Sequence, residues 1–221
     1  MRLEFAFACF LRAESAYNRC MGLAIAIPRP PQRLTLDPLL SDAEFEELCF
    51  ANSDLHFERM KDGVIVVHAP AGFRSGDGNS EINRQLRNWW LEHRRGRAAD
   101  SSAGFYLPDG SMLSPDAAYI TAEQASTLRS DDLDHFLRMT PAFVIELRSK
   151  SDSLPELRRK MEAWIANGAE VGWLVDPYER RVAVYEAGRD AHVETGLTVA
   201  GSGPVEGFVL DLEEVWRCFA I

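Results

Sequence analysis

The sequence predicts a mixed α+β fold, in which helices cover a mixed β-sheet. A strand–helix–strand unit over residues 143–175 favours two parallel strands joined by a right-handed crossover. An apolar stripe at helical spacing predicts a long helix before that unit, over about 79–95. An Asp-Gly turn at residues 62–63, between two β-like runs, indicates an added antiparallel hairpin.

Composition is that of an ordinary globular protein. The chain has 221 residues, 46% of them hydrophobic and 26% charged, and no apolar run approaches the length of a membrane span. The net charge of −10 counts against a general nucleic-acid coat protein, but bound metal ions and a local basic patch could offset it at a nuclease site. The 4 cysteines are scattered, which argues against a zinc site or disulfide framework and fits a reducing cytoplasm.

We expect residues 1–35 to form an extended or poorly ordered extension and residues 36–221 to form one domain. The extension carries a short apolar patch, FAFACFL, but Glu4 interrupts its start, so a signal peptide is disfavoured. Met21 is an alternative start. Residues 22–40 are rich in proline and lack helical periodicity, which predicts an extended arm.

The first expected elements of the domain are a short helix and a hairpin. Ser41 and Glu44 have the spacing of a capping box, which predicts a helix over about 42–51. Strands are expected over about 55–60 and 63–68, on either side of the Asp-Gly turn.

A longer helix is expected next. The Gly/Ser/Asp cluster SGDG predicts a loop, and Asn79 or Ser80 is a suitable N-cap for a helix that ends near Arg95, before Gly96. Its apolar stripe consists of Ile82, Leu86, Trp89 and Trp90.

The second half of the chain predicts five further strands and one well-defined helix. A strand, a Pro-Asp-Gly turn and a strand entered at Asp116 are expected over 104–120, followed by turn-like residues 121–140 with room for a short helix. The strand 143–148 leads into a helix over about 154–167, whose first turn holds Pro155. A hairpin and a terminal amphipathic segment complete the chain.

Two acidic residues on expected strands are candidates for a site. Asp116 directly precedes the apolar run 117–120, and Glu146 lies inside an apolar strand. Burying a carboxylate on a strand is costly unless it is paired or binds a metal. On neighbouring strands the two acids could converge on Mg²⁺ or Mn²⁺, which prefer oxygen ligands. An equally weighted alternative is a turn aspartate and a glutamate paired with Arg148.

Three of the cations that follow Glu146 in the sequence are candidates to act beside it. Arg148 lies two residues on, which on a strand is the same face at a distance of roughly 6.6 Å. Lys150 shares that face if the strand extends so far. Lys160 flanks the buried stripe of the next helix and could lean back over the sheet toward Glu146. The structural alternatives are a weak ion pair at a strand end and a lysine at the edge of the core.

Glu81 is a further candidate. It falls in the first turn of its expected helix, where the helix dipole favours an acid, and this is a sufficient structural explanation by itself. The glycine-rich stretch before it could form a mobile entry to a site.

Four segments of the chain carry a resemblance to a known family. They are GNSEINRQLRNWW, SSAGFYLPDGSMLSPDAAYI, FVIELRSKSDSLPELRRKMEAWIANGAEVGWLVDP and RRVAVYEAG. Together they resemble the Uma-two family of putative restriction endonucleases, in the PD-(D/E)XK nuclease superfamily, over roughly residues 36–216. The resemblance implies an αβββαβ core, here with an added N-terminal helix and hairpin, and hydrolysis of DNA phosphodiester bonds with Mg²⁺ or Mn²⁺.

The resemblance also implies residue roles. Asp116 is the PD acid and Glu146 the second acid, and both would bind the metal, with the backbone carbonyl of Leu147 as a further ligand. Glu81 resembles the helical acid that assists metal binding in many of these nucleases.

The chain departs from the superfamily pattern at one position. Arg148 stands where a lysine is expected, and arginine can orient a phosphate but cannot act as a base. Relatives of this kind are thought to carry the lysine in the following helix, which makes Lys160 its replacement and Lys150 the rival.

The leading interpretation is a metal-dependent DNA endonuclease in which Lys160 and Arg148 stabilise the transition state. A homodimer would supply the two sites that cutting both strands needs. The acidic charge and the missing lysine keep open a nuclease fold that binds DNA or a protein without cutting. A two-carboxylate glycosidase is weaker, because both acids lie next to cations and no proton donor is evident.

Overall fold

The structure, a computed structural model, describes residues 32–68 and 70–220 and confirms the mixed α+β class. The main sheet has six strands in the order β11-β10-β9-β8-β7-β4. Only β8 and β9 are parallel within it. Its strands are β4 (Arg97–Asp100), β7 (Ala117–Ile120), β8 (Phe143–Leu147), β9 (Val171–Asp176), β10 (Arg181–Glu186) and β11 (His192–Glu194). The predicted parallel pair with its helical crossover is therefore confirmed.

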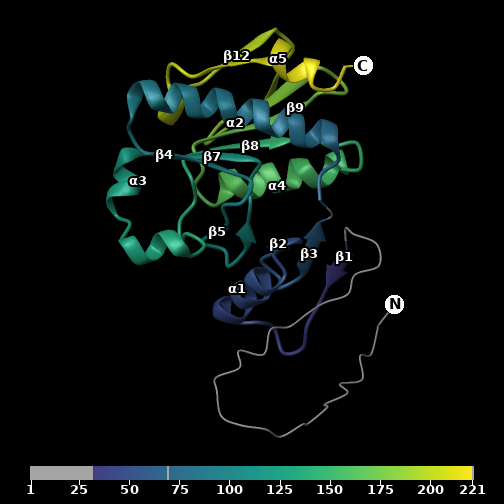
Figure 1. Cartoon of the computed structure of the whole chain (residues 1–221), viewed down its shortest axis with the longest axis vertical. Coiled ribbons are helices and arrows are strands. Elements are labelled where there is room, and N and C mark those ends of the chain that lie inside the picture. Colours follow the sequence, from purple (N-terminus) through teal and green to yellow (C-terminus); the bar gives the residue numbers. More distant parts are fainter. Residues whose placement is uncertain (1–31, 69, 221) are drawn as a thin grey trace, which may run out of the picture.

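A second, antiparallel sheet lies below the main sheet in Figure 1. Its order is β1-β3-β2-β6-β5, and it contains the predicted hairpin. The helix α1 (Asp42–Ala51) packs on it and begins at Ser41 with the predicted capping box. The strands are β1 (Gln32–Leu34), β2 (His56–Arg59), β3 (Ile65–His68), β5 (Phe105–Tyr106) and β6 (Met112–Leu113). Of the extension expected over residues 1–35, residues 1–31 lie outside the described residues, and residues 32–34 form β1, which pairs with β3.

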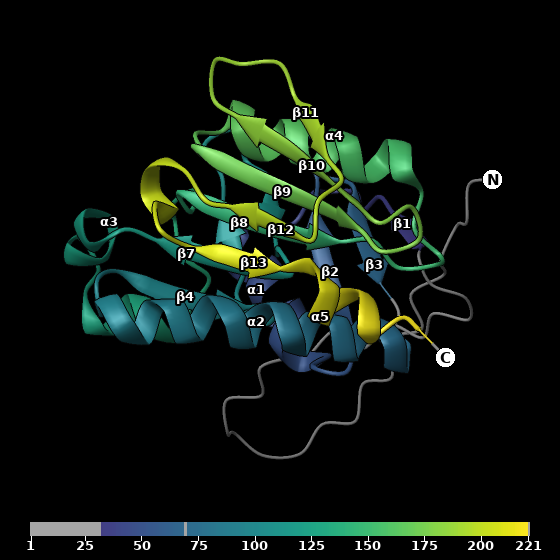
Figure 2. The same ribbon diagram turned by 90° about the horizontal axis from the view of Figure 1, so that it is seen from above.

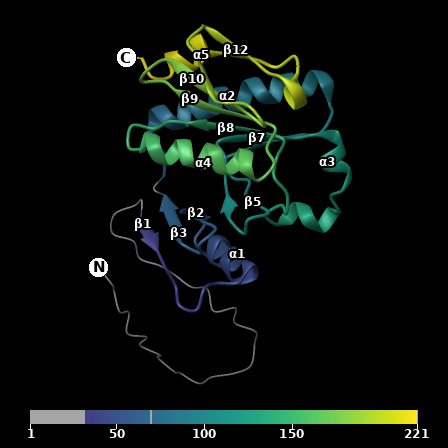
Figure 3. The same cartoon turned by 180° about the vertical axis from the view of Figure 1, so that it is seen from behind.

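Helices cover both faces of the main sheet. The long helix α2 (Phe73–His93) lies above it in Figure 1, and α4 (Leu154–Ala166) lies below, between the two sheets. Figure 3 shows α4 from the opposite side, running along β8 and β9. From above, in Figure 2, α2 shares its face of the sheet with the C-terminal elements β13 (Val209–Asp211) and α5 (Leu212–Arg217). The other short elements are α3 (Ala122–Ser126), β12 (Thr198–Ala200) and the 3₁₀ turns η1 (Ser130–Asp134) and η2 (Gly203–Val205).

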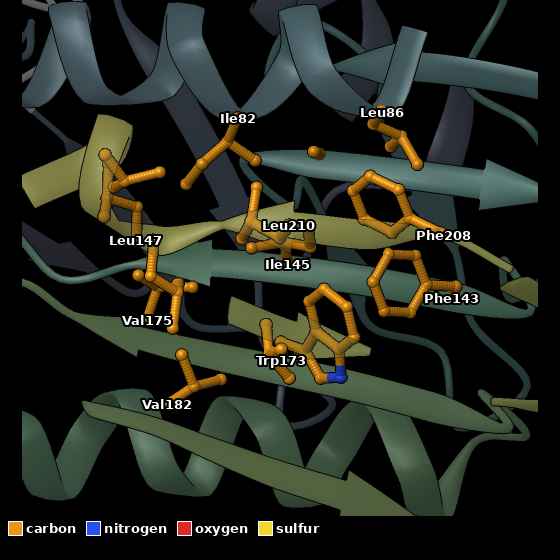
Figure 4. Close-up of a cluster of buried hydrophobic side chains, with 14 of the residues drawn as sticks. Ile82, Leu86, Phe143, Ile145, Leu147, Trp173, Val175, Val182, Phe208 and Leu210 are labelled. Carbon is orange, nitrogen blue, oxygen red and sulfur yellow. The ribbon is translucent and has the colours of Figure 1, made fainter. Parts of the chain in front are cut away.

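The largest hydrophobic cluster lies between α2 and the sheet (Figure 4). Ile82 and Leu86, from the predicted stripe of α2, are fully buried, and Trp89 and Trp90 pack against the same cluster. On the opposite face, Met161 of α4 packs against the sheet in a second cluster. No helix in the described part of the chain is long and apolar enough to span a membrane.

The expected start of α2 is wrong. The helix begins at Phe73 rather than at Asn79 or Ser80, so the predicted SGDG loop is helical. Gly78 explains why packing overrides the low helix propensity of this stretch. A Cβ at that position would lie 2.6 Å from the ring of Phe219 and 3.0 Å from Leu147, so the glycine lets the helix approach the sheet closely.

The strands around residues 97–120 also differ from the prediction. Strand β4 follows α2 directly and was not expected. The short strand β6, in the small sheet, was not expected either, whereas β7, in the main sheet, begins directly after Asp116, where a strand was predicted. Ser114, Pro115 and Asp116 form the crossing between these two strands. Proline lacks the N–H that continued pairing needs, which suits this crossing point. The αβββαβ core consists of α2, β4, β7, β8, α4 and β9.

Candidate functional site

Asp116 occupies the crossing from the small sheet to the main sheet. Its Oδ2 accepts the backbone N–H of Leu147 at 2.7 Å, and its Oδ1 accepts the side-chain amide of Asn79 at 2.8 Å. Asn83, one turn along α2, donates to the backbone carbonyl of Asp116 at 2.9 Å. The carboxylate is thereby fixed between α2 and the end of β8.

Glu146 points from β8 toward α4 and is 3% exposed. Lys160 lies with its Nζ 2.8 Å from Oε1 and 3.0 Å from Oε2, and Trp164 donates its indole N–H to Oε1 at 3.0 Å. Lys160 and Trp164 are four positions apart on α4, so both lie on the side of this helix that faces the sheet. The turn from β8 into α4 therefore brings Lys160 back over Glu146, as its angular position on the helix suggested.

Lys160 has two more partners at the same point. Its Nζ lies 2.7 Å from Oε1 of Glu58, on β2 of the small sheet, and donates to the carbonyl of Ser114 at 2.9 Å. Its side chain is 16% exposed. One ammonium group thus joins the main sheet, the small sheet and the crossing that carries Asp116.

The charges of this cluster are strongly coupled. Burial and the negative charges of Asp116 and Glu58 raise the pKa of Glu146 to about 8. The positive charge of Lys160 lowers this pKa but offsets only part of the increase. Burial also raises the pKa of Asp116, although the hydrogen bond from the Leu147 N–H and the charge of Lys160 both lower it. Burial raises the pKa of Glu58 as well, but Lys160 and His68 have the larger effect and lower this pKa to about 2.

The composition of the site fits a divalent cation. Asp116, Glu146 and Glu58 supply three carboxyl groups against the single ammonium of Lys160, and hard divalent ions prefer such oxygen donors. The amide oxygen of Asn79, beside Asp116, is buried and has no hydrogen-bond partner among the described residues.

A metal ion here would have few side-chain ligands. In the described residues, no group of three or more His, Cys, Asp or Glu side chains is arranged to hold one. Asp116 and Glu146, with the carbonyl of Leu147, would leave the remaining positions to water and substrate, which is usual for Mg²⁺.

Arg148 lies just beyond β8 and is engaged elsewhere. Its Nη1 donates to Oδ2 of Asp176, at the end of β9, at 2.9 Å, and its guanidinium lies over the ring of Tyr178. The alternative in which Glu146 pairs with Arg148 is therefore wrong, because Lys160 takes that place. Lys150 is exposed in the turn that precedes α4, beyond the strand end.

Glu81 does not share the contacts of Asp116. It accepts hydrogen bonds from Arg84, at 2.8 and 2.6 Å, and from Gln85 at 2.8 Å. At about 100° per residue it lies roughly 200° around α2 from Asn79, which faces Asp116. The helical residues that contact Asp116 are Asn79 and Asn83, which the sequence analysis did not propose as site residues.

Glu58 was also missed. It lies in the predicted strand HFER and is 4% exposed, so it is a carboxylate among buried strand residues, the same signal that drew attention to Glu146. Arg59 and Lys61 offered it nearby partners in the sequence, and its actual partner is more than one hundred residues away.

Comparison with known proteins identifies a family and a shared fold. The family model Uma2, described as a putative restriction endonuclease, matches residues 42–213, well over half of the chain. No curated protein matches. The crystal structure of a putative nuclease belonging to DUF820 from Anabaena variabilis ATCC 29413 superposes with a TM-score of 0.62 at 19% identity, covering 74% of this chain and 91% of that chain. This likeness shows a shared fold.

A cryo-EM structure of a DrdV–DNA complex matches more weakly. Its TM-score is 0.32 at 16% identity, covering 50% of this chain and 9% of that chain, and the likeness carries no argument.

Proposed function

The chain belongs to the Uma2 family of putative restriction endonucleases, and from this premise we propose that it is a metal-dependent endonuclease that hydrolyses DNA phosphodiester bonds with Mg²⁺ or Mn²⁺. One observation carries the proposal. At the end of β8, the carboxylate of Asp116, from the β6–β7 crossing, binds the backbone N–H next to Glu146, and Lys160 of α4 pairs with Glu146.

The two acids and the lysine have different roles in this proposal. Asp116 and Glu146 would hold the ion, together with the carbonyl of Leu147. A bound ion supplies a nucleophilic water of lowered pKa and offsets the charge of the phosphate. Lys160, held beside Glu146, stabilises the negative charge that develops on the phosphate in the transition state.

Arg148 has a supporting part in this proposal. Its guanidinium is committed to Asp176 and covers Tyr178, so it fixes the ends of β8 and β9 next to the site. A homodimer would provide a second site for the second DNA strand, and a reducing cytoplasm suits the free thiols of Cys49 and Cys218.

The test is incubation of purified protein with supercoiled plasmid, nicked plasmid and single-stranded DNA in Mg²⁺ and in Mn²⁺. We expect cleavage of at least one substrate that is lost with EDTA and with Glu146→Gln. Cleavage by the variant at the wild-type rate would contradict the proposed site. Cleavage by neither protein, with both folded, would contradict the activity.

A non-catalytic function is favoured by a different observation. Glu146 already accepts hydrogen bonds from Lys160 and Trp164, which compete with a metal ion for its oxygens. A folded protein that binds neither Mn²⁺ nor Mg²⁺ in a calorimetric titration, yet retains DNA or captures a protein, would support this second function.

A further inference from the structure

Glu58 stands out among the buried acidic residues Glu58, Glu146 and Asp176 because it comes from the small sheet. Its Oε1 lies 2.7 Å from Lys160 Nζ and accepts the backbone N–H of Ser114 at 3.1 Å. Its Oε2 lies 3.2 Å from Nε2 of His68 on the neighbouring strand. Both oxygens are thus partnered, and each partner belongs to a different segment.

Burying a carboxylate costs desolvation free energy, which ion pairs and hydrogen bonds can offset. Glu58 sits on a short strand whose neighbours Phe57 and Arg59 are also buried, and an apolar side chain would avoid the cost of desolvation. What the carboxylate provides is an anchor for Lys160 that does not depend on Glu146. The carbonyl of Ser114, only two residues before Asp116, supplies another.

We infer that Glu58 is a positioning residue of the candidate site, which holds the ammonium of Lys160 between β8 and the Ser114–Asp116 crossing. When an oxygen of Glu146 turns to another ligand, Lys160 keeps Glu58 and Ser114 as partners and stays at the site. The β2–β3 hairpin is then part of the functional machinery rather than a peripheral addition. The catalytic meaning of this inference rests on the proposed function, but the hold of Glu58 on Lys160 does not.

Because the chain has few lysines, the proton exchange of the Lys160 ammonium group can be measured directly. There are only three lysines, Lys61, Lys150 and Lys160, and the first two are exposed. In protein labelled with ¹⁵N-lysine, ammonium protons of an exposed lysine exchange rapidly with water, whereas those of an enclosed, ion-paired lysine exchange slowly. The wild type should therefore show one slowly exchanging ammonium signal, which Lys160→Arg removes.

Glu58→Gln keeps the shape and a hydrogen-bond acceptor but removes the charge. We expect its Lys160 signal to exchange about tenfold faster or more, since a charge-assisted hydrogen bond is worth at least that factor. The matched control is Glu46→Gln, which changes a shielded glutamate of α1 that contacts His135 and Phe136 instead of Lys160. Its Lys160 signal should exchange as in the wild type.

Three results would overturn the inference. The first is an unchanged exchange rate in Glu58→Gln, the second an equal acceleration in Glu46→Gln, and the third a wild type without any protected ammonium. The third needs no variant, so the inference remains testable if Glu58→Gln does not fold.

The nuclease assay separates positioning from binding. If the wild type cleaves DNA, Glu58→Gln should lower kcat about tenfold or more and leave KM within about twofold, because misplacing a group costs transition-state stabilisation rather than substrate binding. Unchanged kcat would contradict a positioning role. A wild type that does not cleave overturns the proposed function, while the exchange rates still decide whether Glu58 holds Lys160.

Discussion

Lys160 reaches from the middle of α4 to Glu146 on β8, with Nζ 2.8 Å from Oε1, although the two residues lie 14 positions apart. The parallel crossover creates this contact, because α4 must fold back along the strand it has just left. A cation from the helix therefore fills the space beside the acid. Arg148, which occupies the expected lysine position, is free to pair with Asp176.

Removing either acid should abolish metal binding. We expect Asp116→Asn and Glu146→Gln each to weaken Mn²⁺ binding by about 100-fold or more, since even residues that support metal ligands are worth about 10–100-fold. Isothermal calorimetry measures the affinity, and Asp190→Asn, at an exposed position, is the control. Wild-type affinity in both acid variants would remove these residues from the metal site.

Metal affinity should increase with pH. Burial, with the charges of Asp116 and Glu58, raises the pKa of Glu146 to about 8, so a proton competes with a metal ion for this carboxyl at neutral pH. A protonated carboxyl must lose its proton before it binds a cation, so below about pH 8 the affinity should fall roughly tenfold per pH unit. Mn²⁺ titrations at two pH values, in buffers of different ionisation enthalpy, measure the affinity and the released proton. An affinity independent of pH would exclude Glu146 as a protonated ligand.

Arg148 should matter for stability. Asp176 is 2% exposed, and without Arg148 its nearest remaining cation is Arg181, at 3.8 Å. Arg148→Met should lower the free energy of unfolding by about 2–3 kcal/mol, below the usual range for a broken buried pair because Arg148 is partly exposed. Urea unfolding measures the loss.

The control for this pair is Arg159→Met, which removes an exposed arginine of α4 whose Nη2 lies 3.8 Å from Oε1 of Glu156. It should change the free energy of unfolding by less than about 0.5 kcal/mol. Equal effects of the two substitutions would show that the Arg148–Asp176 pair adds no stability.

Two glycines test the unexpected start of α2. Gly76 has no atom within 4 Å of an added Cβ, whereas Gly78 faces Phe219 and Leu147. Gly76→Ala should stabilise the protein by about 0.5–1 kcal/mol, because alanine favours a helix. Gly78→Ala should lose that gain and about 1–3 kcal/mol more through crowding. Equal melting temperatures for the two variants would contradict the close packing of this helix on the sheet.

Local signals explain what the sequence predicted well. The capping box at Ser41 fixed the start of α1, and the apolar stripe with Pro155 fixed α4, because both depend on neighbours within one helical turn. The same short spacing placed Lys160 beside the buried face of α4, from which its contact with Glu146 follows.

Long-range contacts explain what the sequence did not predict. The SGDG stretch has loop propensity, yet it is helical and packs closely at Gly78 against Leu147 of β8 and Phe219. Arg148 and Glu58 each have a plausible partner nearby in the sequence, yet their ion pairs are with Asp176 and Lys160. Such pairings depend on which strands become neighbours.

The most direct test of the central claim compares two lysines. In plasmid cleavage with Mg²⁺, Lys160→Met should lower the initial rate by about 100-fold or more, since a charge-stabilising group is worth about 2.7–4 kcal/mol in the transition state. Lys150→Met removes the same group from an exposed turn and should retain the wild-type rate within about threefold. A protein in which Lys150→Met is inactive while Lys160→Met cleaves normally would contradict the assignment of Lys160 as the cation that acts beside Glu146.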